Sequence, residues 1–164
     1  MSEEDRAPRS STGLPSSTKP PKYFLELAEF ISKQYSFARK IVEIGVGRSP
    51  YTALRLRKLL PKTDLILVDI DGRVVEDLRR LGFKAVKDDV QVPRLEIYKN
   101  ADLLYSIRPP FELIPRLIDL ASLIGSDLII APLSEDAYLS GIGRGFERIG
   151  LGEVVVYLLR LMRR

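Results

Sequence analysis

The residues of this sequence best suited to form a ligand site are two acids and two glycines at the ends of apolar runs. Glu43, Gly45 and Gly47 occupy alternate positions at the end of one run, and Asp69 closes the next run, 22 residues beyond Gly47. Glycine lets the backbone turn tightly and lets a ligand approach closely. A carboxylate at about this separation binds a ribose hydroxyl in nucleotide-binding βαβ units. The pattern therefore predicts a site for a small nucleoside-type ligand.

Two further polar segments follow later apolar runs. Asp88 and Asp89 end one of them, and residues 105–111, which read YSIRPPF, end another. Ligands bind beyond the carboxyl ends of the strands in an open parallel sheet, so both segments are predicted to lie near the glycine bend. One of the two aspartates is expected to be a turn residue, and which one faces a ligand stays open.

The composition excludes several kinds of chemistry. The 164 residues include no cysteine and no histidine, so thiolate nucleophiles, disulfides, ordinary zinc sites and a histidine base are ruled out. No metal site is expected. Asp88, Asp89 and Tyr105 are the bases available near the predicted site, and the sequence singles out none of them as catalytic.

Alternating strand and helix patterns are expected to position these residues. Apolar strands interleaved with helices indicate a parallel sheet covered on both faces, hence a three-layer, doubly wound α/β fold. The predicted strands are 40–44, 65–69, 84–87, 102–106, 127–131, a possible strand that opens at 145–148, and 153–162. The predicted helices are 21–35, 51–60, 73–81, a short turn at 94–98, 111–124 and a weak candidate at 135–140.

Local signals predict where the helices begin and end. Ser49 is expected to be the N-cap of the 51–60 helix, with Pro50 in its first turn. Asp71 is interpreted as the N-cap of the 73–81 helix rather than as a ligand contact. Glu76 and Arg80 are spaced to form an i,i+4 pair in that helix.

The ends of the chain differ from its middle. Residues 1–20 are rich in serine, proline and charged residues and are predicted to be a disordered tail, and residues 21–164 a single domain. No apolar stretch approaches the roughly 18–20 residues that a membrane span needs, and the N-terminus lacks the apolar core of a signal peptide. The expectation is a cytoplasmic protein that does not bind a membrane.

The charge balance gives only weak information about partners. The formal net charge is +4, and the sequence pI is about 9.4. This mild surplus is compatible with nucleic acid or with an anionic ligand and favours neither. Arg55, Lys58 and Lys62 share one helix face, which is usually a solvated surface and less often a nucleic-acid contact.

Glu43, Gly45 and Gly47, with the later acids and the turn of Pro109 and Pro110, resemble class I S-adenosylmethionine-dependent methyltransferases. Three stretches are closer still to a small archaeal family of uncharacterised proteins with that fold: VEIGVGRSP, the run from Asp88 to Tyr98, and YSIRPP. The resemblance covers residues 40–162. It implies a Rossmann-like sheet with an antiparallel last strand, and S-adenosylmethionine as cofactor.

The same resemblance implies a role for each candidate residue. The backbone of 45–47 would lie against the methionine and ribose of the ligand, with Glu43 below it. Asp69 would bind the ribose, and one of the pair 88–89 would lie near the adenine ring. The segment 105–111, which contains Tyr105, Arg108, Pro109 and Pro110, would lie beside the sulfonium methyl group.

The chain departs from the methyltransferase pattern at two positions. Ser49 replaces a frequent third glycine. Arg108 stands where amino-group methyltransferases carry Asn or Asp directly before the two prolines, and a guanidinium cannot accept a hydrogen bond from a target amine. Arg108 suits a carboxylate or a phosphate, or equally a salt bridge to a loop carboxylate.

The glycines also allow two other interpretations. A nicotinamide dinucleotide fingerprint needs Gly or Ala where the chain has Pro50, so S-adenosylmethionine is favoured without excluding the dinucleotide. The glycines at 141, 143 and 145 follow no strand and are interpreted as a loop.

Two functional hypotheses follow. The first is an S-adenosylmethionine-binding, methyltransferase-like protein of unknown acceptor, whose acceptor side comes from the first helix, residues 107–111 and residues 132–145, or from a second copy or partner. The alternative is a non-catalytic Rossmann-like module that acts in assembly or RNA association. RNA or protein is the acceptor class considered, and a homodimer is an open possibility.

Overall fold

The computed structural model describes residues 19–132, 145–152 and 154–162, and their strands form one seven-stranded sheet. The strands are β1 (Lys40–Ile44), β2 (Asp64–Asp69), β3 (Lys84–Lys87), β4 (Leu103–Ile107), β5 (Asp127–Ala131), β6 (Phe146–Leu151) and β7 (Val154–Leu159). Their order is β3-β2-β1-β4-β5-β7-β6. The first five strands are parallel, whereas β7 is antiparallel to both β5 and β6. The predicted mainly parallel sheet with an antiparallel last strand is confirmed.

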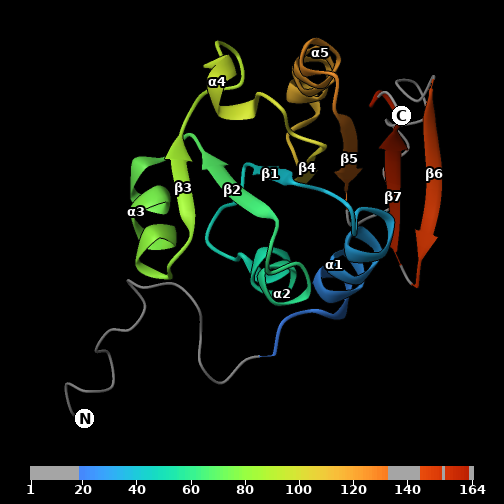
Figure 1. Ribbon diagram of the computed structural model, residues 1–164, viewed down its shortest axis with the longest axis horizontal. Helices are drawn as coiled ribbons and strands as arrows, with labels where there is room; N and C mark the ends of the chain where they lie inside the picture. The colour runs from blue at the N-terminus through green and yellow to red at the C-terminus, as the bar shows by residue number, and fades with distance from the viewer. Residues whose placement is uncertain (1–18, 133–144, 153, 163–164) are drawn as a thin grey trace.

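Helices cover both faces of the sheet (Figure 1). The helices are α1 (Lys22–Gln34), α2 (Tyr51–Leu59), α3 (Gly72–Arg80), α4 (Leu95–Tyr98) and α5 (Ile114–Ile124), with a 3-10 turn, η3 (Phe111–Leu113), before α5. Apolar side chains of α1, α2 and α3 pack on one face, and those of α4 and α5 pack on the other. The three predicted layers are therefore present.

Alternation along β1 and β4 decides which candidate side chains share a face. Val42 and Ile44 point to the face covered by α5, whereas Ile41 points to the face covered by α1 and α2. Successive strand residues point to opposite faces, so Glu43 lies on the α1 and α2 side. Tyr105 of β4 is the register partner of Glu43 and lies on the same side. The parallel register thus brings together two polar side chains that are far apart in the sequence.

The helix ends differ in part from the sequence-based expectations. Pro50 occupies the N-cap position of α2 without a side-chain cap, so the prediction of Ser49 as N-cap is wrong. The bend already turns the chain at Gly47, and α2 starts at Tyr51, as predicted. The Asp71 side chain caps α3 by accepting from the Arg73 N–H at 2.9 Å, as predicted.

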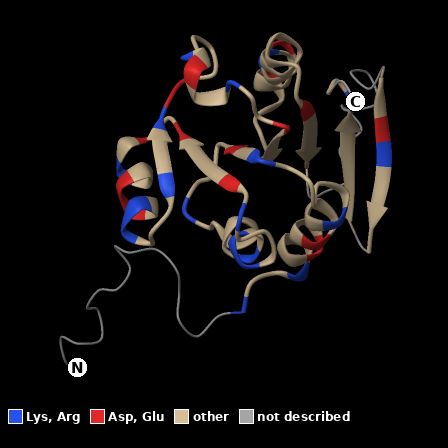
Figure 2. Cartoon of the chain, viewed as in Figure 1, with Lys and Arg blue, Asp and Glu red and all other residues tan. Residues whose placement is uncertain are grey.

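Charged pairing within α3 also differs from the prediction. Glu76 pairs with Arg79 at 3.2 Å, and Asp77 pairs with Arg80 at 3.1 Å, both at i,i+3 spacing. The predicted Glu76–Arg80 pair is therefore replaced, because Asp77 lies between two arginines and takes Arg80. Positions of basic and acidic residues alternate along the elements in Figure 2.

Some predictions lie outside the described residues. The candidate helix 135–140 and the glycines at 141 and 143 are among them, and the division into a 1–20 tail and a 21–164 domain stays a prediction. Within the described part of the chain, no helix combines the length and the apolar character needed to cross a membrane.

Candidate ligand site at the carboxyl edge of the sheet

The bend between β1 and α2 depends on two glycines with positive φ. Gly45 has φ 75° and Gly47 has φ 70°, which is the left-handed region that residues with a side chain rarely adopt. The Gly45 N–H donates to the Val68 carbonyl of β2 at 2.8 Å, which ties the bend to the neighbouring strand. A Cβ added at Gly47 would meet no described atom within 4 Å. Space is therefore open beside the bend.

Asp69, the last residue of β2, faces this bend. Its Oδ2 accepts from the Gly47 N–H at 2.9 Å, and its Oδ1 accepts from the Asp71 N–H at 2.9 Å. The residue is 8% exposed. Asp69 thus joins the glycine bend to the start of α3, and it keeps a small opening to solvent at the edge of the sheet.

Glu43 lies below the bend and is bound by a tyrosine of β4. The Tyr105 hydroxyl donates to Glu43 Oε1 at 2.7 Å, and both side chains are buried. Burial, together with the charge of Asp69, raises the pKa of Glu43 to about 8, against an opposing effect of the Tyr105 hydrogen bond. Burial and the adjacent Glu43 raise the pKa of Tyr105 well above its usual range. At neutral pH, Glu43 is therefore mainly a neutral acid, and Tyr105 is a poor base.

Asp88, at the end of β3, is enclosed by α4. The Tyr98 hydroxyl donates to its Oδ2 at 2.6 Å, and Arg94 reaches its Oδ1 through Nε at 3.2 Å. The Arg94 N–H adds a longer contact, and the Arg94 side chain also donates to the Lys87 carbonyl. These contacts hold α4 on the sheet, so Asp88 has a structural role.

Asp89 is the more accessible member of the pair. It is half-buried, and its Oδ1 accepts from the Gln91 N–H at 2.9 Å in a local turn. It is therefore the turn residue that the sequence predicts for one of the two aspartates. Of the pair, its carboxylate is the one open to a ligand at this edge.

A depression of about 330 Å³ lies beside the bend. Its lining includes both glycines of the bend, Glu43, Phe24 of α1, Ile107 at the end of β4 and Arg108 directly after β4. Tyr105 lies beneath it through Glu43, Pro109 is buried, and Pro110 is exposed. The predicted site residues of β1, β2 and β4 are thus brought together.

Sequence reasoning missed two residues of this edge. Ile70 directly follows Asp69 and is 62% exposed, and Phe24 lines the depression although its periodicity marks it only as a core residue. A large aliphatic residue between two aspartates at the end of a strand was a signal that could have identified Ile70. Phe24 gave no comparable signal, because the approach of α1 to the bend depends on tertiary packing.

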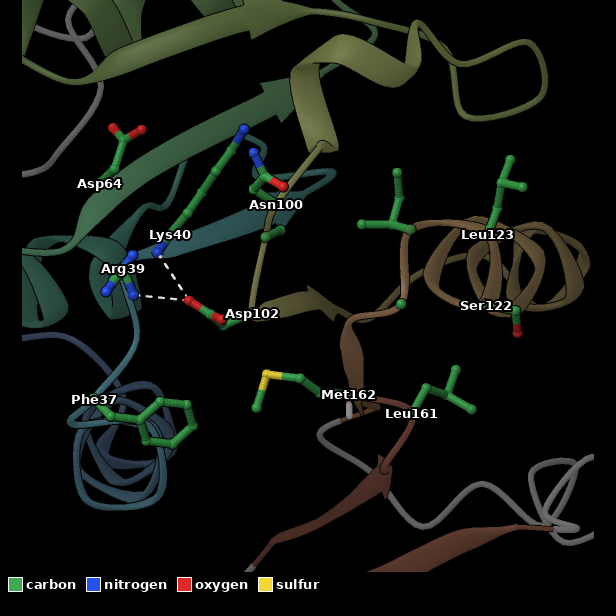
Figure 3. A pocket seen from close by; sticks show the side chains of 13 residues that line it. Phe37, Arg39, Lys40, Asp64, Asn100, Asp102, Ser122, Leu123, Leu161 and Met162 are labelled. Atoms are coloured by element: carbon green, nitrogen blue, oxygen red, sulfur yellow. Dashed lines mark hydrogen bonds between the residues drawn. The ribbon is translucent and has the colours of Figure 1, made fainter. Parts of the chain in front are cut away.

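A second depression, of about 1160 Å³ and thus larger than the one beside the bend, lies at the opposite edge of the sheet (Figure 3). Its floor includes Asp102, whose Oδ2 accepts from the Arg39 N–H at 2.7 Å and the Lys40 N–H at 3.2 Å. Exposed Phe37 and Leu123 lie on its rim. The Asp102 carboxylate is occupied by backbone groups, and this edge is formed by the amino ends of the strands, whereas ligands of such sheets bind at the carboxyl ends, so size alone does not make it the better candidate.

Comparison with known sequences identifies close relatives. A model of the family described as "Uncharacterised protein family (UPF0146)" matches residues 24–143. The UPF0146 protein of Methanocaldococcus jannaschii is 42% identical over 109 residues, which are 65% of this chain and 77% of that protein. The relative from Pyrococcus horikoshii is 41% identical over 118 residues, or 72% and 88% of the two chains. These archaeal relatives confirm the resemblance seen in the sequence.

Comparison with solved structures confirms the methyltransferase-like Rossmann fold. The human methyltransferase 10 domain containing protein has a TM-score of 0.66 at 15% identity, covering 89% of this chain and 84% of that chain. An O-methyltransferase family protein from Burkholderia thailandensis has a TM-score of 0.64 at 10% identity, covering 87% and 57%. The plantazolicin methyltransferase BpumL in complex with a pentazolic desmethylPZN analog and SAH has a TM-score of 0.58 at 21% identity, covering 76% and 52%. At these identities, the likeness concerns the fold alone.

Proposed function

This chain belongs to the protein family UPF0146, and we propose that it binds S-adenosylmethionine across the bend between β1 and α2. The proposed activity is methyl transfer to an acceptor that the described residues do not identify. The ligand would lie along the carboxyl edge of the sheet, from the β3 loop to the β4 loop.

The observation that carries the proposal is the pairing of the glycine bend with Asp69. Both glycines have positive φ, the space beside Gly47 is open, and the carboxylate of the adjacent strand lies at the same loop. A ligand that contacts the backbone at Gly47 would therefore come within reach of Asp69. The sequence separation of the two residues agrees with that of ribose-binding acids.

Asp69 keeps hydrogen-bonding capacity for a sugar. Each oxygen of an ionised carboxylate offers about two lone-pair sites, and the structure gives each Asp69 oxygen one backbone donor. One site per oxygen is then available for two vicinal hydroxyl groups. The two backbone contacts also fix the orientation of the carboxylate before a ligand arrives, which lowers the entropy cost of binding.

The adenine end of the ligand would rest against Ile70. An aliphatic side chain that is 62% exposed loses apolar area to water when a flat ring covers it. Asp89 lies on the next strand's loop and can accept a hydrogen bond from an exocyclic amine. Ile70 and Asp89 would thus supply an apolar surface and a polar group for the base.

The sulfonium of the ligand supplies an already activated methyl group, so the chain's own task is to position the reactants and exclude water. Phe24 and Ile107 give the depression apolar walls, and the Glu43–Tyr105 pair closes its floor. A neutral Glu43 and a high-pKa Tyr105 are poor bases. The proposed reaction therefore depends on an acceptor that needs little deprotonation.

Arg108 favours a second candidate, a non-catalytic module that keeps the ligand pocket and acts in assembly or RNA association. A guanidinium replaces the hydrogen-bond acceptor that amine methylation uses at this position. Ligand binding is common to both candidates. Turnover separates them.

Calorimetric titration with S-adenosylmethionine and S-adenosylhomocysteine tests the proposal. Ile70→Ala is expected to weaken binding about five- to tenfold, since truncating a covered aliphatic side chain removes roughly 1–1.5 kcal/mol of apolar burial. Leu123→Ala is the matched control, because Leu123 is 68% exposed at the opposite edge of the sheet. Equal affinity of Ile70→Ala and Leu123→Ala for these ligands, or no heat from the wild type at millimolar ligand, would contradict the proposal.

Identifying the acceptor needs a separate experiment. Mass spectrometry of molecules that co-purify with the chain would supply candidates, and each would be incubated with the protein and methyl-labelled S-adenosylmethionine. Label transfer supports the enzyme, while tight ligand binding without transfer to any recovered molecule favours the non-catalytic module.

A further inference from the structure

Arg108 has an unusual backbone conformation for an arginine. Its φ is 53°, in the left-handed region, and only Asn100 shares a positive φ among the described residues other than glycine. Arg108 also precedes Pro109, and the proline ring restricts the backbone of the residue before it. The left-handed conformation costs a residue with a side chain roughly 1–2 kcal/mol. A glycine would fit this turn with less strain.

The surrounding sheet fixes this conformation. The Arg108 N–H donates to the Ala131 carbonyl of β5 at 2.8 Å, directly after the last register pair of β4 and β5. Pro109 is buried beneath the turn. The direction in which the Arg108 side chain leaves the backbone is therefore set by the end of the sheet rather than by a mobile loop.

The Arg108 guanidinium is uncommitted in the part of the chain that the structure describes. No hydrogen bond or ion pair of its side chain is found there, and the residue is exposed. Arg48, the other arginine at this depression, is bound to Asp77 at 2.7 Å. Arg108 is thus the arginine of the depression whose five N–H donors are all available.

We propose that Arg108 binds a carboxylate or phosphate group of a molecule held in the depression beside the glycine bend. The proposal rests on the proposed function, because that molecule is either the nucleoside ligand or the acceptor that meets it. A planar guanidinium binds either anion through two parallel hydrogen bonds and fixes its orientation. Backbone strain retained at a solvent-facing arginine is typical of a functional position.

The anion has two possible sources. One is the carboxylate on the methionine part of S-adenosylmethionine, and the other is an anionic group of the acceptor. In the second case the bound anion only positions the acceptor, because anion oxygens that accept guanidinium hydrogen bonds are weakened nucleophiles. The methyl group would then go to a different atom of the acceptor.

The test compares Arg108→Met and Arg108→Lys with Arg39→Met, which removes the same charge at the opposite edge of the sheet. Three probes are titrated: S-adenosylhomocysteine, 5′-methylthioadenosine, which lacks the amino-acid part, and inorganic phosphate added to protein saturated with S-adenosylhomocysteine. Folding of each variant is checked by thermal unfolding. Arg108→Lys keeps the positive charge but lacks the paired N–H donors of the guanidinium, so it is expected to lose part of the affinity for the anion.

If the ligand supplies the anion, Arg108→Met weakens S-adenosylhomocysteine binding at least tenfold and leaves methylthioadenosine binding unchanged. If the acceptor supplies it, both nucleosides bind as in the wild type, and phosphate binding to the saturated protein is lost. Equal binding of all three probes by wild type and Arg108→Met overturns the proposal.

The two proposals can fail separately. Wild-type protein that binds nucleosides, with no effect of Arg108→Met, contradicts the role of Arg108 alone. Wild-type protein that binds neither nucleoside contradicts the proposed function, and phosphate titration of the free protein then decides whether Arg108 binds anions. Loss of phosphate binding in Arg108→Met, with Arg39→Met unaffected, supports the anion site in that case.

Discussion

The Gly47 N–H donates a 2.9 Å hydrogen bond to Asp69 Oδ2 and so joins two loops that lie 22 residues apart in the sequence. The second oxygen of Asp69 accepts from the Asp71 N–H, and Asp71 in turn caps α3. One carboxylate thereby organises the bend after β1 and the start of the helix after β2. The same residue has both a structural role and the proposed ribose contact.

Asp69→Asn is expected to lower the free energy of unfolding by about 1–3 kcal/mol. The amide nitrogen that replaces one oxygen cannot accept from a backbone N–H, so one of the two donors loses its partner. Chemical denaturation measures the effect. Asp89→Asn is the control, since Asp89 is half-buried and makes one local contact, and a change within about 0.5 kcal/mol is expected there. Equal effects in the two variants would contradict this role of Asp69.

Glu43 is expected to make stability depend on pH. Its pKa is raised from 4.5 to about 8 in the folded chain, so the folded state holds the proton more tightly than the unfolded state. The contribution of Glu43 to the free energy of unfolding therefore falls as pH rises from about 4.5 to about 8, and is constant above that. Glu43→Gln, which cannot ionise, should remove this slope.

The measurement is the free energy of unfolding at several pH values in that window for both proteins. The free energy of unfolding of Glu43→Gln is expected to rise relative to that of the wild type as pH rises, by on the order of 4 kcal/mol at pH 8. Parallel pH profiles for the two proteins would show that the pKa of Glu43 is not raised in the folded chain.

Tyr98→Phe separates the structural role of Asp88 from ligand binding. It removes the 2.6 Å hydrogen bond to a buried carboxylate and should cost about 1–3 kcal/mol of stability. Affinity for S-adenosylhomocysteine should change less than twofold at a temperature where the variant is folded. A large loss of affinity with little loss of stability would place Asp88 at the ligand after all.

Arg108→Gly should stabilise the chain by about 1 kcal/mol, because glycine adopts a φ of 53° without the penalty that a side chain incurs. The greater freedom of glycine in the unfolded chain reduces this gain. Thermal unfolding monitors the change, and the phosphate titration described above monitors the loss of anion binding. A destabilised Arg108→Gly would mean that the arginine side chain supports the turn.

The strands and most helices could be predicted from the sequence because buried parallel strands are apolar throughout and helices carry a periodic face. Glu43 and Asp69 were recognisable because each interrupts or ends such a run beside glycine or another turn signal. The Glu43–Tyr105 hydrogen bond was not predictable, since it depends on the register of β1 with β4. Register is a property of the sheet rather than of either strand.

The different roles of the two aspartates after β3 also could not be predicted from the sequence. Neighbouring residues of one type give no local signal about which is enclosed, and Asp88 is enclosed only because α4 brings Tyr98 and Arg94 over it. The prediction of Ser49 as the N-cap of α2 was wrong for a local reason. Serine and proline in sequence fit a helix start, yet the preceding glycine bend sets where the first helical turn can begin.

Ligand binding at the glycine bend is tested most directly by an amide chemical-shift map of ¹⁵N-labelled protein with S-adenosylhomocysteine. Saturable shifts are expected in three regions of the carboxyl edge, 45–49, 69–72 and 107–108, with the opposite edge at 39–40 and 100–102 unchanged. Shifts confined to that opposite edge, or none at millimolar ligand, would contradict binding at the bend.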